Sequence, residues 1–170
     1  MTLKIAGAIL IVVSCGAFGF CVARNHRREV FALEQLILAL DYMESELKYN
    51  LSALPELAQS LVTVTKGAVR DVFQRFLKEL DNQILPDAEK CMHIALGNIK
   101  DIPPITLSCF KSFAQTLGKF DLEGQEKSLV ILRQNCEKKL DNYMKDQDNR
   151  LRSYQTLGLC AGAALAILFV

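Results

Sequence analysis

Few residues in this sequence are of the types that carry out catalysis. The chain has two histidines, His26 and His93, which lie far apart in sequence. It contains no glycine-rich phosphate loop, no G-x-S-x-G turn and no H-E-x-x-H pair. Carboxylates two positions apart, such as Glu44 and Glu46, do not face each other on a helix and suit a solvated surface. We therefore predict no catalytic residues and a protein that is not an enzyme.

The six cysteines raise the question of a metal site or disulfides. Cys91, Cys109 and Cys136 are separated by 18 and 27 positions, and the sequence has no C-x-x-C pair. The other three lie in apolar stretches, at positions 15, 21 and 160. Zinc sites need clustered thiolates or imidazoles, and structural disulfides are rare in a reducing cytosol. We therefore expect reduced, mostly buried thiols, with no metal and no cofactor.

Two apolar stretches stand at the ends of the 170-residue chain. Residues 5–23 carry no charge, and as a helix they would span about 28 Å, close to the thickness of a bilayer core. Residues 153–170 also carry no charge. These stretches predict transmembrane helices at 3–23 and 154–170, with one domain at 24–153. A cleaved signal peptide is the weaker alternative, because the only charged leader residue is Lys4 and no A-x-A site ends the apolar stretch.

The charges are distributed around these stretches. All 19 acidic residues lie between Glu29 and Asp148, with 14 of the 20 basic residues, so this interval has a net charge of −5. Basic residues beside a membrane span favour the cytoplasmic face, which predicts a cytoplasmic domain. The residues expected to set this topology are Arg24, Arg27, Arg28, Arg150 and Arg152. An acidic body also argues against binding to nucleic acid.

The intervening sequence carries the apolar repeat of helices, divided by glycine and proline. Only residues 61–65 are typical of a strand. Ser52 can cap a second helix, and breaks at Gly67, Pro86, Gly97 and Pro103 separate the following helices. The pattern predicts an all-α fold, a six-helix antiparallel cytoplasmic bundle flanked by two terminal transmembrane helices. Since residues 24–29 and 125–157 contain no glycine or proline, we expect the first and last helices to continue into the apolar stretches.

A corner between the fifth and last helices is formed by Leu117, Gly118, Asp121 and Gln125. Gly118 can end one helix in the left-handed conformation, and Asp121 can cap the next. Gln125 follows one turn later on the same face. From the residue types, this corner has a structural role.

The last apolar stretch carries small residues four positions apart, at Gly158, Gly162 and Ala166. Such spacing allows another helix to approach closely. The neighbour would be the first apolar helix of the same chain or, alternatively, a partner protein.

The corner L-G-x-x-D-x-x-x-Q resembles a signature of the platform family of type II secretion and type IV pilus systems. The whole chain resembles, more closely, the stage III sporulation AB family. That resemblance rests on the length, the apolar ends, the polar anchors Glu46 and Tyr49, the corner, and the tail from Leu157 to Val170. No single motif is specific to this family, whereas the joint arrangement of the motifs is specific.

The resemblance implies a role in endospore formation, as a component of the channel between mother cell and forespore. It implies a place in the outer forespore membrane, with the bundle in the mother-cell cytoplasm. There the protein would dock a secretion-type ATPase, stage III sporulation protein AA, and contact other stage III A channel proteins. Secretion platforms usually carry two such bundles, and a homo-oligomer would supply the second.

Two other functions compete with this interpretation. A small membrane transporter or pore subunit is disfavoured because the apolar stretches contain no ionisable residue, which ion pathways normally need. A membrane-bound sensor would face outward, whereas the flanking arginines predict a domain on the inside.

Overall fold

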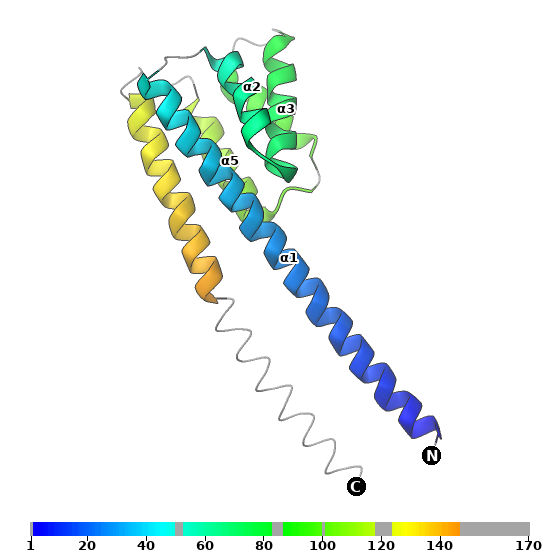
Figure 1. Cartoon of the computed structure of the whole chain (residues 1–170). Helices are drawn as coiled ribbons and strands as arrows, with labels where there is room; N and C mark the ends of the chain where they lie inside the picture. Colours follow the sequence, from blue (N-terminus) through cyan, green and yellow to red (C-terminus); the bar gives the residue numbers. More distant parts are fainter. Residues whose placement is uncertain (1, 50–52, 83–86, 100, 118–123, 147–170) are drawn as a thin grey trace.

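The computed structural model describes residues 2–49, 53–82, 87–99, 101–117 and 124–146, with side chains from Arg24 onward. These residues form six α-helices (Figure 1). The helices are α1 (Thr2–Tyr49), α2 (Leu54–Val64), α3 (Gly67–Asp81), α4 (Ala88–Gly97), α5 (Pro104–Thr116) and a final helix of residues 124–146.

Helix α1 is continuous over 48 residues, or about 72 Å at 1.5 Å per residue. Its carboxyl-terminal half packs in the bundle, whereas its amino-terminal half projects well beyond it (Figure 1). The predicted continuity across residues 24–29 is confirmed. The bundle is therefore built directly on a helix that extends outside it.

The predicted fold class is wrong in its two terminal transmembrane helices. Within the part of the chain that the structure describes, no helix is both long enough and apolar enough to cross a membrane. In the part of α1 whose side chains are described, Arg24, Arg27, Arg28 and Glu34 are exposed beside buried residues, so this part of the helix is amphipathic and not uniformly apolar. The predicted second span, 154–170, lies outside the described residues.

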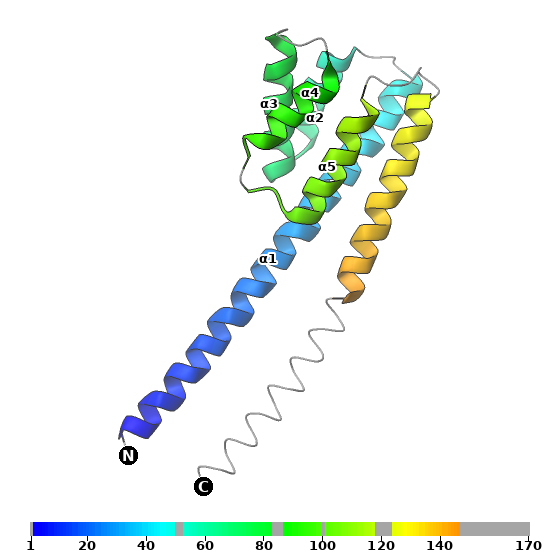
Figure 2. The same cartoon turned by 180° about the vertical axis from the view of Figure 1, so that it is seen from behind.

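The two long helices lie side by side with opposite chain directions. Helices α2, α3 and α4 lie on one side of α1, and the final helix lies on the other (Figures 1 and 2). Helix α5 packs against α1 and α4. The antiparallel relation of α1 and the final helix matches the prediction for this pair.

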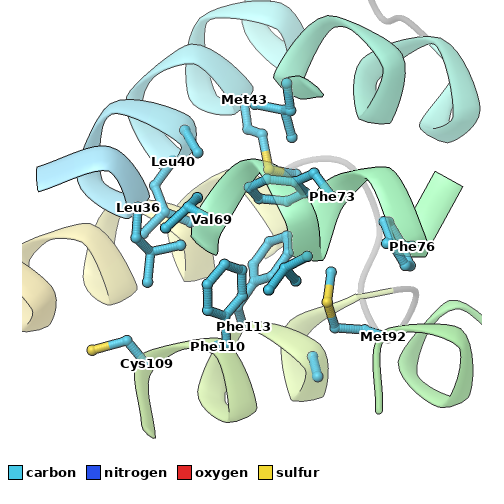
Figure 3. Packing of buried hydrophobic residues seen from close by; sticks show 14 of the residues in the cluster. Leu36, Leu40, Met43, Val69, Phe73, Phe76, Met92, Cys109, Phe110 and Phe113 are labelled. Carbon is cyan, nitrogen blue, oxygen red and sulfur yellow. The ribbon is translucent and has the colours of Figure 1, made fainter. Parts of the chain in front are cut away.

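The core is aromatic at its centre and aliphatic along α1. Phe73 of α3 contacts Phe110 and Phe113 of α5 edge-on, with ring centroids 5.7 and 6.3 Å apart (Figure 3). All three rings are fully buried. The α1 side of this core consists of Leu33, Leu36, Ala39, Leu40 and Met43. These residues recur every three or four positions, so they form one buried face of α1.

Capping and helix-end residues mark the boundaries of α2 and α4. Asp87 caps α4 by accepting a hydrogen bond from the backbone N–H of Glu89 at 3.1 Å. Helix α2 begins after Ala53, one residue later than the predicted cap, and Ser52 lies outside the described residues. The stretch typical of a strand, 61–65, instead completes α2. Thr65 ends that helix, and its hydroxyl donates to the carbonyl of Leu61 at 2.6 Å.

Gly67 is required by its backbone conformation at the start of α3. Its φ is +62°, in the region that L residues rarely adopt. A Cβ at this position would lie 3.3 Å from a ring carbon of Phe31 on α1. Glycine therefore permits both the turn and the close approach of α3 to α1.

Candidate coupling site between the two long helices

The predicted corner is partly described. Leu117 is 3% exposed and closes α5, and its backbone N–H bonds to the carbonyl of Ala114 at 3.3 Å. Gln125 is half-buried in the first turn of the final helix. Gly118 and Asp121 lie outside the described residues. The left-handed turn and the cap predicted for them remain predictions.

The predicted topology-setting arginines that the structure describes are Arg24, Arg27 and Arg28, and all three are exposed. Arg28 also forms an ion pair with Asp101, at 3.6 Å, in the turn before α5. Arg150 and Arg152 lie outside the described residues, as do the small residues Gly158, Gly162 and Ala166. Arg28 therefore contributes to a contact within the bundle in addition to any role at a surface.

A buried carboxylate joins α1 to the beginning of α5. Glu29 is 3% exposed, and one of its oxygens accepts two hydrogen bonds from Thr106. The backbone N–H of Thr106 donates at 2.9 Å and its hydroxyl at 3.1 Å. Thr106 is the third residue of α5, where the backbone N–H groups lack partners within the helix and the helix dipole favours an anion. These bonds offset the cost of burying a carboxylate.

An aromatic contact brings the final helix to the same place. The rings of His26, on α1, and Tyr143, on the final helix, lie 4.7 Å apart. Burial and then the negative charge of Glu29 raise the pKa of Tyr143. His26 is one turn before Glu29 on α1. Three helices thus meet at one polar junction, formed by His26, Glu29, Thr106 and Tyr143.

An ion-pair cluster joins the two long helices nearer the other end of the bundle. Arg133 of the final helix donates from Nε to Glu44 Oε2 at 3.2 Å and lies 3.9 Å from Asp41 Oδ1, both on α1. Its Nη1 also bonds to Glu137 Oε1 at 2.8 Å. Burial opposes the charge of Arg133, but the three carboxylates outweigh it and raise the pKa of the guanidinium. The polar junction and this cluster fix the register of the final helix against α1.

Two buried cysteines belong to α5 and the final helix. Cys109 of α5 and Cys136 of the final helix are 1% and 0% exposed, and each thiol shifts the pKa of the other. Lys139 Nζ lies 3.7 Å from Cys109 Sγ and 3.0 Å from Ser108 Oγ. The thiol of Cys136 and then Lys139 lower the pKa of Cys109 to about 7, against the opposing effect of burial. The three cysteines that the structure describes, Cys91, Cys109 and Cys136, are buried and are not in disulfides.

No catalytic constellation accompanies these contacts in the described residues. Within them, no group of three or more His, Cys, Asp or Glu side chains could hold a metal ion. A surface hollow of about 680 Å³ lies between α3 and the turn before α5. It is lined by Asp71, Gln74, Arg75, Lys78, Glu79, Asn98, Ile99 and Asp101. Its lining carries charges of both signs and includes no cysteine, serine, threonine or histidine. The arrangement is suited to holding helices in register.

The sequence did not predict the buried role of Glu29, the ion pairs of Arg133 or the mutual influence of Cys109 and Cys136. A signal for Glu29 was present, because it falls four positions before Leu33 and continues the apolar stripe of α1. A carboxylate on a core stripe indicates a buried partner. No comparable signal pointed to the mutual influence of Cys109 and Cys136, since helix register between distant segments is absent from local patterns.

Comparison with known proteins gives the family. Residues 4–170 match the family model of stage III sporulation protein AB. The chain belongs to the stage III sporulation protein AB family. It is 26% identical over 171 residues to "Stage III sporulation protein AB" of Bacillus subtilis (strain 168), and the alignment covers 99% of each chain. The stage III sporulation AB family thus accounts for nearly the whole sequence, and a role in sporulation follows from it.

A solved structure has the same fold. Stage III sporulation protein AB (SpoIIIAB) superposes with a TM-score of 0.64 at 22% identity, over 72% of this chain and 98% of that chain. The resemblance predicted from the corner, the ends and the tail is confirmed by the family match. The six-helix arrangement is therefore a property that this member of the stage III sporulation AB family shares with a solved relative.

Proposed function

We propose that this chain is a non-catalytic platform of the mother cell–forespore channel complex, which docks a secretion-type ATPase during sporulation. The ATPase is stage III sporulation protein AA, and other stage III A proteins are the further partners. The observation that carries this proposal is the continuous helix α1, which extends from outside the bundle into its core. A rigid element of this kind can pass movement from a docked motor to a distant point.

The junctions between the long helices support the same function. The Arg133 cluster and the buried Glu29 tie the final helix and α5 to α1. A partner that displaces the final helix would thus displace α1 with it. Packed helices with polar ties transmit such movement because their interiors have low compressibility.

The proposed location is the outer forespore membrane, with the bundle in the mother-cell cytoplasm. Arg24, Arg27 and Arg28 are exposed just before Glu29, the first buried residue of α1 among the described side chains. Clustered arginines are attracted to anionic lipid headgroups on the cytoplasmic side. Fractionation of sporulating cells, with fluorescence imaging of the tagged chain, tests this location, and an even cytoplasmic signal would contradict it.

Binding of the purified full-length chain to the purified ATPase tests the docking. We expect saturable binding that weakens at high salt, because the body between Glu29 and Asp148 carries a net charge of −5. The exposed acidic residues Asp141 and Asp146 of the final helix are candidates for the contact. The variant Asp141→Lys/Asp146→Lys should bind more weakly, and the control Lys111→Glu, exposed on α5, should bind normally. If the unaltered chain does not bind, the docking proposal is wrong.

A further inference from the structure

We propose that copies of this chain associate with one another, with an exposed face of α1 in one copy packed against an exposed face of the final helix in the next. The side chains of the α1 face are all exposed, and they are Glu34, Leu38, Asp41 and Tyr49. Those of the final-helix face are also exposed, and they are Ile131, Lys138 and Lys145. The occupant of each face is a second copy of the chain, and the contact is separate from ATPase docking.

The α1 face combines apolar and acidic side chains. Leu38 is 42% exposed and Tyr49 is 76% exposed. Glu34 and Asp41 lie one turn before and one turn after Leu38, so both carboxylates border that side chain. Asp41 lies 3.9 Å from Arg133 of its own chain, but its side chain remains 64% exposed. The face therefore offers a neighbouring helix an apolar contact that is edged by negative charge.

The final-helix face carries the opposite charge. Ile131, Lys138 and Lys145 follow one another at intervals of seven positions, so they form one stripe along the helix. Ile131 is 59% exposed. Within the described part of the chain, Lys138 and Lys145 take part in no ion pair. This face therefore offers an exposed aliphatic side chain and two positive charges that are available to a partner.

The charges of the two faces match in spacing when the helices run in opposite directions. Glu34 and Asp41 are seven positions apart, or about 10.5 Å along the helix axis. Lys138 and Lys145 have the same separation. Antiparallel packing that sets Asp41 opposite Lys138 therefore sets Glu34 opposite Lys145 as well. Complementary charges of this kind fix the register of an interface and disfavour other registers.

The same register brings apolar side chains together. Tyr49 lies eight positions after Asp41, and Ile131 lies seven positions before Lys138. In the antiparallel alignment Tyr49 and Ile131 thus meet within one residue of each other. Covering these two exposed side chains removes apolar surface from water, which favours association. Each face supplies the charge that the other lacks, so a second copy of this chain satisfies both.

The arrangement keeps α1 pointing in one direction in every copy. Within one chain, α1 and the final helix lie side by side and run in opposite directions (Figures 1 and 2). When the final helix of one copy runs antiparallel to α1 of its neighbour, the α1 helices of the two copies are parallel. The amino-terminal halves of α1 therefore project from the same side of the assembly.

The contact is heterologous, because it joins two different surfaces. In a pair of copies, one α1 face and one final-helix face remain uncovered. Further copies add to these faces until the assembly closes into a ring or continues as a filament. Association therefore proceeds beyond a dimer.

Sedimentation velocity of the purified full-length chain, without the ATPase, measures this association. We expect a mass that rises with protein concentration, exceeds that of a dimer and falls at high salt, because exposed ion pairs are screened. A chain that stays monomeric, or that stops at a dimer, would overturn the proposal. Since the ATPase is absent, this result is independent of the docking test.

Charge reversal tests the two faces separately. The variant Glu34→Lys/Asp41→Lys sets lysine opposite lysine, and Lys138→Glu/Lys145→Glu sets carboxylate opposite carboxylate. Each variant alone should associate at least about ten-fold more weakly than the unaltered chain, because like charges then meet. Mixed in equal amounts, the two variants should associate as tightly as the unaltered chain, since each meets its complement on the other. If both variants are folded by circular dichroism and their mixture associates as weakly as either one, the proposal is wrong.

A matched control separates these faces from net charge. The variant Arg75→Glu/Lys78→Glu changes the net charge as much as Lys138→Glu/Lys145→Glu does, at exposed side chains of α3. It should associate like the unaltered chain. Equal weakening in the two variants would show that net charge is responsible, and would overturn the proposal.

Crosslinking between copies tests the register. A carbodiimide joins a carboxylate directly to an adjacent amine, and mixing isotopically light and heavy chains distinguishes links between copies from links within one. We expect a link between Asp41 of one copy and Lys138 of another, found by peptide mass mapping. Links between copies that involve neither the α1 face nor the final-helix face would contradict the proposed contact.

Discussion

The carboxylate of Glu29 accepts hydrogen bonds from both the backbone N–H and the hydroxyl of Thr106, 77 positions later in the chain. Glu29 is the first buried residue of α1 among the described side chains, and Thr106 lies in the first turn of α5. The bond therefore marks the point where α1 enters the bundle. It also holds the first turn of α5 next to Glu29, and so fixes the position of α5 relative to α1.

Replacing Glu29 should destabilise the bundle. Glu29→Ala leaves two buried donors of Thr106 without an acceptor, and we expect a loss of about 2–3 kcal/mol in the free energy of unfolding. Glu29→Gln keeps a carbonyl acceptor and should cost less, about 1 kcal/mol. Glu34→Ala, exposed on the same helix, should stay within about 0.5 kcal/mol. Urea denaturation measures all three, and equal values for Glu29→Ala and Glu34→Ala would contradict the buried bond.

Replacing Arg133 should loosen the contact between the two long helices. Arg133→Met keeps most of the aliphatic volume but removes the bonds to Glu44 and Glu137. Because the Arg133 side chain is 26% exposed, we expect a loss of about 1–2 kcal/mol, smaller in high salt. Arg70→Met, exposed on α3, is the matched control. A loss that does not change with salt concentration would show that packing, and not charge, is responsible.

Gly67 and Gly97 should respond in opposite ways to alanine. At Gly67 the φ of +62° and the contact with Phe31 predict a loss of about 1–2 kcal/mol for Gly67→Ala. At Gly97, the last residue of α4, nothing lies within 4 Å of an added Cβ. Gly97→Ala should therefore be neutral or stabilise by up to about 1 kcal/mol, since alanine loses less chain entropy on folding. Thermal melts of the two variants, moving in the same direction, would disagree with this prediction.

Removing the central ring should nearly unfold the protein. Phe73 is fully buried between Phe110 and Phe113, so Phe73→Ala should cost about 3–5 kcal/mol. Ile131→Ala, at a side chain 59% exposed on the final helix, should cost under about 1 kcal/mol. Circular dichroism during chemical denaturation distinguishes them. Similar midpoints for both variants would mean that the aromatic cluster is not the centre of the core.

Local chemistry explains which parts of the fold were predictable. Asp87 and Pro104 mark helix starts, and the absence of any breaker in residues 24–29 predicted the continuity of α1. Residues 61–65 were misjudged because valine and threonine favour strands, whereas Leu57, Ala58 and Leu61 bury one helical face in the core. Tertiary packing overrode local propensity there.

The candidate site was the least predictable part. The contact of Arg133 with Asp41 and Glu44, like that of Lys139 with Cys109, joins residues from separate helices. Their pairing depends on the axial register of each helix relative to its neighbour. Apolar periodicity does not determine that register. The terminal transmembrane helices were predicted from length and hydropathy alone, and the helices of the described residues do not include such a span.

The measurement that most directly tests the platform is spore formation by cells whose α1 is interrupted where it enters the bundle. Seven residues of glycine and serine inserted between Arg24 and Asn25 break the helix, and seven of alanine, glutamate and lysine keep it helical and nearly in phase. We expect both variants to bind the ATPase and only the helical insertion to support spore formation. Normal spore numbers with the glycine–serine insertion would contradict transmission through α1.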